Sequence, residues 1–342
     1  MQLWTTFCPQ KVCWELAYRA THGDLPTSDW QKKKGLIRDS LETLRHYGIS
    51  GIRLVIFPYE ITDGESFDFS SVEYILELCQ QIGLQVDFCL GPFQYPHYPG
   101  IRLPYTYTQR VKQSEAALDE DTFLNNFGHI FLKAQLQKFG NDPRIRGFYL
   151  GNEWPDRQGL EGRKDIQTVI SRAFMQKAVS ICKKLTEKPI LFNTNIDASL
   201  TWRVQSVFKD FIGDLGKQVR LGFDVYPSQE TWKNKWLQKL SPYAKAVSSL
   251  TQLLPRDQML FTELEAQPWG GGRAWEYYLK QAPQPQEGVL TYRRESFPST
   301  WERYVIPSRI QEVNLWGSDF WLVCYAAGIT WPLEQVKKYS RS

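Results

Sequence analysis

The chain alternates between stretches with helical hydrophobic spacing and short runs that are almost wholly apolar. Ile37, Leu41 and Leu44 repeat at the helical period, and they lead through a glycine to the run GIRLVIF at 51–57. The same unit recurs along the chain, and a shorter helix near 300–311, interrupted by Pro307, precedes the last run. The further apolar runs lie at 84–90, 145–152, 189–195, 219–226, 258–265 and 313–317.

These runs predict parallel β-strands that are buried on both faces, because they are rich in Val, Ile, Leu and Phe and do not alternate with polar residues. Counting LWTTF at 3–7 as the first strand gives eight strands. Regular alternation of helix and strand implies right-handed crossovers. We therefore expect an α/β fold, a (β/α)₈ TIM barrel that occupies 1–342 as a single domain.

An open, doubly wound sheet is the competing architecture for the same alternation. Such sheets usually carry a glycine-rich nucleotide turn after the first strand, and the sequence has none there. Long irregular stretches at 91–120, 154–165 and 266–298 each follow a predicted strand. In a barrel they would lie at the carboxyl ends of the strands, where barrel enzymes build their sites.

Composition excludes several classes of function. The net charge of +4 comes without a dense basic stripe, so we expect no nucleic-acid partner. Four scattered histidines, without an HExxH motif, predict no metal site, and no cofactor is implied. The apolar stretch at 316–329 is too short and polar to span a membrane. The sequence does not indicate the oligomeric state.

The location of the protein is predicted from its first residues and its cysteines. No basic segment followed by an apolar core opens the chain, so we expect a cytoplasmic protein, unless a secretion signal has been removed. The six cysteines form no CxxC pair, and several occupy apolar positions in predicted helices or strands. This usage is typical of reduced core thiols.

Two carboxylates stand at the ends of predicted strands and carry the candidate chemistry. Strand four ends FYLGNEW, with Glu153, and strand seven ends LFTELE, with Glu263. Strands four and seven face each other across a barrel, so the two side chains can converge on one bond. Cleaving a glycosidic bond needs one acid for the leaving oxygen and one carboxylate at the anomeric carbon, about 5–5.5 Å apart in retaining enzymes. Glu265 is the rival nucleophile, but we expect it further into the loop.

This pattern resembles clan A of the retaining glycoside hydrolases, which includes the cellulase-like family 5. The resemblance rests on the Asn152-Glu153 pair and on the Thr-Glu end of strand seven, which Pro268-Trp269 follow. It implies that Glu153 is the acid/base and Glu263 the nucleophile. Asn152 would bind the sugar 2-hydroxyl.

Further site residues are implied by the same resemblance. Arg53 and Tyr226 would hold the nucleophile ionised and oriented. Trp316 would form the floor of the −1 subsite, which binds the sugar whose anomeric carbon is attacked. His97 is a candidate donor from the loop after strand three, although this chain departs from the clan in its histidines. Trp154 and Trp269 are candidate subsite walls. Each of these side chains also has a purely structural interpretation, and for Glu60 and Asp319 we expect solvated loop charges.

The sequence therefore predicts an enzyme that hydrolyses O-glycosidic, β-linked bonds by double displacement, with a carbohydrate substrate as its partner. Two alternatives stay open. A non-catalytic barrel would bind carbohydrate without turnover, and a transglycosylase would transfer the sugar from the same two glutamates to another sugar. The sugar, the linkage, and exo or endo action depend on loop residues that one sequence does not rank.

Overall fold

A computed structural model describes residues 1–16, 30–91, 122–152, 172–195, 216–226, 256–266 and 296–340. Packing divides the chain into two compact units. One comprises Met1–Ile52, Gln81–Leu84 and Phe223–Ser342, and the other comprises Arg53–Gln80 and Gln85–Gly222. The prediction that 1–342 forms one domain stays a prediction.

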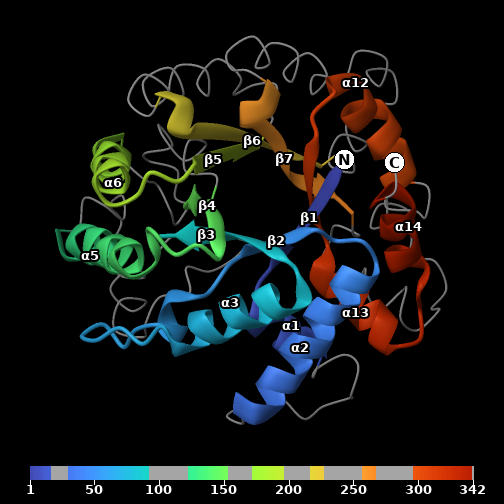
Figure 1. Ribbon diagram of the computed structural model, residues 1–342, viewed down its shortest axis with the longest axis horizontal. Coiled ribbons are helices and arrows are strands. Elements are labelled where there is room, and N and C mark those ends of the chain that lie inside the picture. Colours follow the sequence, from blue (N-terminus) through green and yellow to red (C-terminus); the bar gives the residue numbers. More distant parts are fainter. Residues whose placement is uncertain are drawn as a thin grey trace, which may run out of the picture. The chain divides into compact units, whose positions relative to one another are not determined.

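The strands form a closed barrel in which their order follows the chain, from β1 to β8 (Figure 1). The pairs β3–β4, β4–β5, β7–β8 and β8–β1 are parallel. This result confirms the predicted TIM barrel, and the open doubly wound sheet is excluded. The strands are β1 (Gln2–Phe7), β2 (Gly51–Leu54), β3 (Gln85–Leu90), β4 (Ile145–Leu150), β5 (Ile190–Asn195), β6 (Val219–Val225), β7 (Met259–Glu265) and β8 (Glu312–Trp316).

The strands are buried on both faces, as their unbroken apolar runs predict. All residues of β2, β7 and β8 are buried. The second strand is shorter than the predicted 51–57, because β2 ends at Leu54 and a 3₁₀ turn, η2 (Pro58–Glu60), follows soon after. Pro58 has no backbone N–H to donate to a neighbouring strand, and it restricts the residue before it.

Helices occur where the helical spacing predicts them, wherever the structure describes the chain. Two further stretches with helical spacing, at 204–215 and 247–254, lie outside the described residues. The helical segment before β8 ends at Ser308 rather than near 311. Its irregular part is the π-helical turn η7 (Trp301–Val305), so the predicted interruption at Pro307 is wrong in position. Pro307 lies in the first turn of the last short helix, where a missing N–H is tolerated. The helices are α1 (Pro9–Glu15), α2 (Trp30–His46), α3 (Ser70–Ile82), α5 (Thr122–Phe139), α6 (Arg172–Leu185), α11 (Ser296–Thr300), α12 (Ile306–Ser308), α13 (Ser318–Ala326) and α14 (Trp331–Ser340).

Aromatic rings fill much of the core of the unit that contains β3, β4 and β5. Phe139, at the end of α5, meets Phe69 and Phe88 edge-on, with ring centroids 5.3 and 5.6 Å apart. The helices α5 and α6 lie side by side (Figure 1), and His129 of α5 stacks on Phe174 of α6 at 4.4 Å. These contacts hold α5 against β3 and α6 against α5.

In the other unit, α1 packs against α2 and α13, and α13 also contacts β1. The close approach of β1 and β2 depends on a glycine. A Cβ atom added at Gly51 would lie only 2.5 Å from the indole of Trp4, so no larger residue fits without a shift. Gly51 therefore allows the Trp4 ring to lie close to the start of β2.

All six cysteines are buried and form no disulfide, which confirms the core thiols predicted from the sequence. Loss of hydration on burial raises the pKa of Cys8, Cys79, Cys182 and Cys324 to about 12. These thiols stay protonated at neutral pH and are poor nucleophiles.

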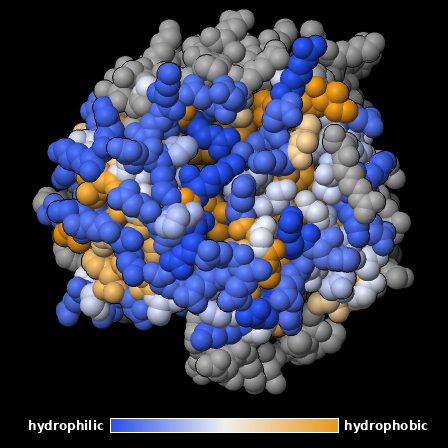
Figure 2. Space-filling view, viewed as in Figure 1, coloured by the Kyte–Doolittle hydropathy of each residue, from blue (hydrophilic) through white to orange (hydrophobic). Residues whose placement is uncertain are grey.

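The described surface carries mainly hydrophilic residues on the face shown in Figure 2, with small apolar areas between them. Within the described part of the chain, every helix is too short or too polar to cross a bilayer.

Candidate active site

Glu263 lies near the carboxyl end of β7, and its side chain is held by a neighbouring strand. The hydroxyl of Tyr226, the residue directly after β6, donates a hydrogen bond to Oε2 of Glu263. Both residues are 3% exposed. A hydrogen bond to a carboxylate in such surroundings is stronger than one in water and favours the ionised form. The sequence predicted both residues for this site, and the structure places them in contact.

A β-bulge in β7 lies next to this carboxylate. Phe261 pairs with Val313 and Leu264 pairs with Leu315, so β7 carries one more residue than β8 between the two pairs. A bulge of this kind breaks the alternation of side chains and redirects them. Hydrophobic spacing along β7 does not reveal this extra residue, because it is defined by the pairing of β7 with β8.

The bulge explains how two consecutive residues of β7 reach the same strand. Thr262 donates to Oδ1 of Asp224 at 2.6 Å, while Glu263 accepts from Tyr226. Asp224 and Tyr226 are two positions apart along β6, and such residues share a face of a regular strand. The Thr262–Asp224 bond is fully buried, so it fixes the bulge from which the Glu263 side chain extends.

Glu265, the rival candidate, is also 3% exposed. It is the last residue of β7, with Trp316 as its partner on β8. The expectation that Glu265 lies further into the loop is therefore wrong. The choice between the two glutamates rests on the Tyr226 hydroxyl, which bonds to Glu263.

The second unit holds another buried polar group, centred on Asn152. The Nη2 atom of Arg53, on β2, donates to Oδ1 of Asn152, and Nδ2 of Asn193, on β5, donates to the same oxygen at 2.7 Å. All three side chains are at most 3% exposed. Asn152 stands two residues beyond β4, after Gly151, whose φ of 69° is readily adopted only by glycine.

Two other side chains also contact Arg53. Its guanidinium lies 4.3 Å from the ring centroid of Tyr149, and its Nε donates to Sγ of Cys89 at 3.4 Å. Sequence reasoning did not select Asn193, Tyr149 or Cys89. Asn193 was visible as a polar residue in the apolar run PILFNTN, whereas Tyr149 and Cys89 read as ordinary core residues.

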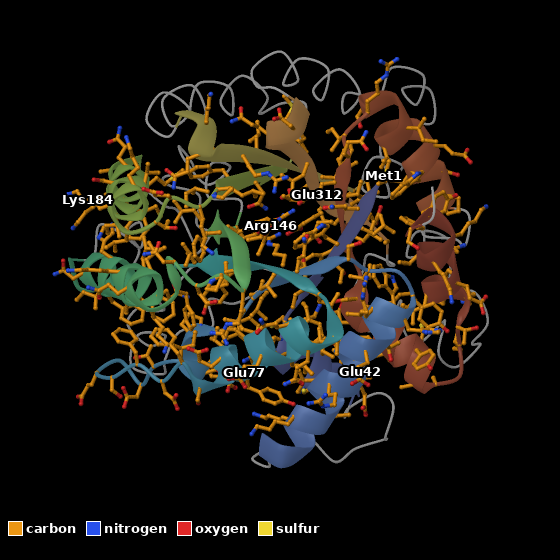
Figure 3. The ribbon with its side chains drawn as sticks, viewed as in Figure 1. Met1, Glu42, Glu77, Arg146, Lys184 and Glu312 are labelled. Atoms are coloured by element: carbon orange, nitrogen blue, oxygen red, sulfur yellow. The ribbon has the colours of Figure 1, made fainter. Side chains whose placement is uncertain are left out.

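A partly buried ion pair joins β3 and β4 in the same unit. Asp87 is 2% exposed and accepts two hydrogen bonds from Arg146, of which the one from Nε measures 2.9 Å. Arg146 is labelled in Figure 3. Bidentate geometry compensates the carboxylate for its lost hydration. The pair lies before the carboxyl ends of both strands, so we assign it to the barrel wall.

Trp316 ends β8, as predicted, and is 4% exposed. Nζ of Lys11, on α1, lies 5.6 Å from its ring centroid and also forms an ion pair with Asp319, on α13. Asp319 is 6% exposed, so the expectation of a solvated loop charge is wrong for this residue. The reason is tertiary, because α1 and α13 pack together and bring the two charges into contact.

Several predicted site residues lie outside the described residues, namely Glu153, Trp154, His97 and Trp269. Among the residues that the structure does describe, no three His, Cys, Asp or Glu side chains gather as metal ligands would. What the described geometry offers is one buried carboxylate with a phenol donor and one asparagine held by two donors.

No protein-family model matches the chain, and no curated protein matches it either. Solved structures do match. The GH5_18 enzyme of Bifidobacterium longum subsp. infantis is 11% identical with a TM-score of 0.64, and the match covers 99% of this chain and 79% of that one. GH5_18 from Streptomyces cattleya, in complex with GlcNAc, is 12% identical with a TM-score of 0.63, covering 100% and 80%.

The exo-β-1,4-mannosidase of Opitutaceae bacterium strain TAV5 is 13% identical with a TM-score of 0.61, and the match covers 100% of this chain and 59% of that one. These similarities show that the chain shares its fold with (β/α)₈ barrels that include glycoside hydrolases. The barrel fold that the resemblance to clan A implies is therefore confirmed. Fold alone does not assign chemistry, which has to be argued from the site.

Proposed function

We propose that this protein is a retaining glycoside hydrolase in which Glu263 is the nucleophile and Glu153 the acid/base. The observation that carries the proposal is the buried Glu263 carboxylate at the end of β7, held by the Tyr226 hydroxyl. The barrel it belongs to has the fold of known glycosidases. An oriented carboxylate at a strand end is what attack on an anomeric carbon requires.

The reaction proceeds in two displacements. In the first, a carboxylate oxygen of Glu263 bonds to the anomeric carbon while Glu153 gives its proton to the leaving oxygen, which departs as an alcohol. In the second, Glu153, now a carboxylate, takes a proton from water, and the water oxygen displaces Glu263 from the same carbon. Two inversions retain the configuration, and neither a metal nor a cofactor takes part.

Other residues that the structure describes orient the reacting groups or stabilise their charge. The Tyr226 hydroxyl orients the attacking oxygens of Glu263 and stabilises their negative charge before attack. Asn152 precedes Glu153 directly, and we assign its amide to the sugar hydroxyl nearest the anomeric carbon, the 2-hydroxyl. Arg53 holds Asn152 in place by donating a hydrogen bond to its Oδ1. Hydrogen bonds to this hydroxyl strengthen in the transition state.

The sugars bound or cleaved by the similar proteins suggest where to look for the substrate. These proteins include an exo-β-1,4-mannosidase, and a GH5_18 protein in complex with Manβ1-4GlcNAc. Xylanases and β-galactosidases match as well. We therefore propose a β-linked glycoside and would begin with aryl β-mannosides, β-glucosides, β-galactosides and β-xylosides.

The test is release of the aryl group by purified protein, followed by labelling with the 2-fluoro analogue of the best substrate. We expect turnover with retained configuration and a covalent sugar on the peptide that contains Glu263. Sugar binding without release of any aryl group would instead identify a carbohydrate-binding barrel. Transfer of the sugar to an added acceptor in preference to water would identify a transglycosylase.

Glu153 is tested separately, because an acid/base variant has its own signature. Glu153→Ala should still react with a substrate whose leaving group needs no proton, and should then stall as the glycosyl-enzyme. Added azide needs no base, so it should restore turnover and give a glycosyl azide of retained configuration. A Glu153→Ala variant with unchanged turnover of a poor leaving group would exclude this role.

The predicted cytoplasmic location stays a prediction.

A further inference from the structure

Asn152 is held through one atom of its amide. Its Oδ1 accepts from the Arg53 guanidinium and also from Nδ2 of Asn193, at 2.7 Å. A carbonyl oxygen has two lone pairs, so these two donors satisfy it. The two donors come from different strands, β2 and β5, and all three side chains are buried.

This arrangement decides which way the Asn152 amide points. Arginine has only N–H donors, so the Asn152 atom that meets it is the oxygen. The asparagine amide is planar, and its NH₂ group therefore points away from Arg53. Asn193 offers its nitrogen to the same oxygen, so a flipped Asn152 would set N–H against N–H on both sides.

We propose that Asn193 is a positioning residue that orients the Asn152 amide, so that its NH₂ group donates to the 2-hydroxyl of the sugar at the cleaved bond. This inference rests on the proposed function and extends it to a residue on β5. Arg53 contributes charge and is fixed by Tyr149 and Cys89. Asn193 carries no charge, so its contribution is the direction of its hydrogen bond, which fixes the orientation of the Asn152 amide.

The inference predicts an effect that depends on one substrate hydroxyl. Without Asn193, the Asn152 amide can rotate and loses the alignment on which its bond to the 2-hydroxyl depends. Because that bond strengthens in the transition state, the loss should fall on kcat more than on KM. A substrate without the 2-hydroxyl never makes this hydrogen bond, so its kinetic constants should not change when Asn193 is replaced.

The experiment measures kcat and KM for the best aryl glycoside of the panel and for its 2-deoxy counterpart. One 2-deoxy compound serves for both the gluco and the manno series, because the two differ only at that carbon. For Asn193→Ala we expect about a tenfold loss of kcat/KM on the hydroxylated substrate, the value of one hydrogen bond. On the 2-deoxy substrate the loss should stay below about twofold, within ordinary scatter for such variants.

A second variant separates the hydrogen bond from the space that the side chain fills. Asn193→Asp keeps the size of the residue but places a carboxylate oxygen against Oδ1 of Asn152. Its loss on the hydroxylated substrate should be at least that of Asn193→Ala. It also keeps the proposal testable if the alanine variant does not fold, which circular dichroism and thermal melting would show.

Asn314→Ala is the matched control. Asn314 is also 1% exposed and lies on β8, where its Oδ1 meets the hydroxyl of Thr6 at 3.5 Å. Removing it should alter both substrates by the same factor. Equal losses on both substrates in the Asn193 variants would overturn the positioning role. No hydrolysis of either substrate by the unchanged protein would instead overturn the proposed function, and with it this inference.

Discussion

Single polar atoms at strand ends define the chemistry of this barrel. Glu263 and Tyr226 are almost inaccessible to water, and so are Asn152, Asn193 and Arg53. Burying such groups without partners costs free energy, so their hydrogen bonds contribute to stability as well as to the proposed function. This dual role means that kinetic tests at these positions need a measurement of stability beside them.

Replacing the proposed nucleophile should abolish turnover. We expect Glu263→Ala to lose about 3–7 kcal/mol of transition-state stabilisation, taking each tenfold loss of rate as about 1.36 kcal/mol. Steady-state kinetics on the best aryl glycoside measures this loss. Near-normal turnover, or a fluorosugar label on Glu265, would show that the nucleophile has been misassigned.

Tyr226→Phe removes one hydroxyl and keeps the ring. The carboxylate of Glu263 then loses a charge-assisted hydrogen bond, which is worth about 1.5–3 kcal/mol in buried surroundings. We expect kcat to fall roughly 10- to 150-fold, with the variant still forming a trapped glycosyl-enzyme. Unchanged kcat together with unchanged labelling would show that Tyr226 only packs against Glu263.

At the scale of elements, local departures from regular structure position these residues. The bulge in β7 brings Thr262 and Glu263 to partners on β6, and Gly151 turns the chain after β4 so that Asn152 meets its two donors. Bulges and strained turns are frequent near active sites, because they redirect side chains that a regular strand would alternate. The rest of each strand keeps ordinary barrel geometry.

The contact of β1 with β2 gives a test at this scale. Gly51→Ala would place a methyl group 2.5 Å from the Trp4 ring, and we expect a loss of about 1–3 kcal/mol in the free energy of unfolding. The matched control is Gly35→Ala on α2, where nothing lies within 4 Å of the added atom. Alanine favours a helix, so the control should gain about 0.5–1 kcal/mol. Urea denaturation of both variants measures the difference, and equal changes would contradict the assigned contact.

At the scale of the whole molecule, stability depends on charge as well as on the apolar core. A cluster of ion pairs lies before β4, at the amino-terminal end of the strand. Arg144 bonds to both Asp142 and Glu73, and Lys138 pairs with Glu73 at 2.9 Å. In such barrels this end of the strands is associated with stability, whereas the opposite end carries the active site.

This cluster makes stability depend on pH. The hydrogen bonds from Arg144 hold the pKa of Asp142 below its ordinary value. Burial by itself raises the pKa of Glu73, but hydrogen bonds from Lys138 and Arg144 outweigh it, and the net direction is down. Carboxyls with a depressed pKa stabilise the fold above their unfolded values of about 4. That contribution is lost as the pH falls below 4 through the depressed native pKa values.

We therefore expect Arg144→Gln to destabilise the protein at pH 7 and to differ less from the parent at pH 3. Denaturation by urea at both pH values measures the difference. The control is Arg38→Gln, which breaks an exposed pair with Glu42 on α2 that measures 3.6 Å. Such a pair contributes only about 0.3–0.5 kcal/mol, so little should change at either pH. A constant difference for Arg144→Gln across the pH range would contradict the assigned ion pairs.

Much of the fold followed from hydrophobic pattern alone. A strand buried on both faces must be apolar at nearly every position, and a helix on the outside must be apolar on one side. These local requirements placed the eight strands and the described helices that precede a strand, whereas α1, α13 and α14 were not predicted. They also placed Glu263, Tyr226 and Asn152 at strand ends, because the polar residue that follows an apolar run is visible in one sequence.

What the sequence did not reveal depends on partners that are distant along the chain. The two donors to Asn152 come from 53 and 193, and Lys11 meets Asp319 through the packing of α1 on α13. The bulge in β7 is likewise defined only by its register with β8. Periodicity reports how each segment packs against the core, so the sequence by itself determined the barrel and the position of Glu263 near the end of its strand. The tertiary structure decided which side chains orient Glu263 and Asn152, because hydrogen bonds between strands depend on distances that no local pattern encodes.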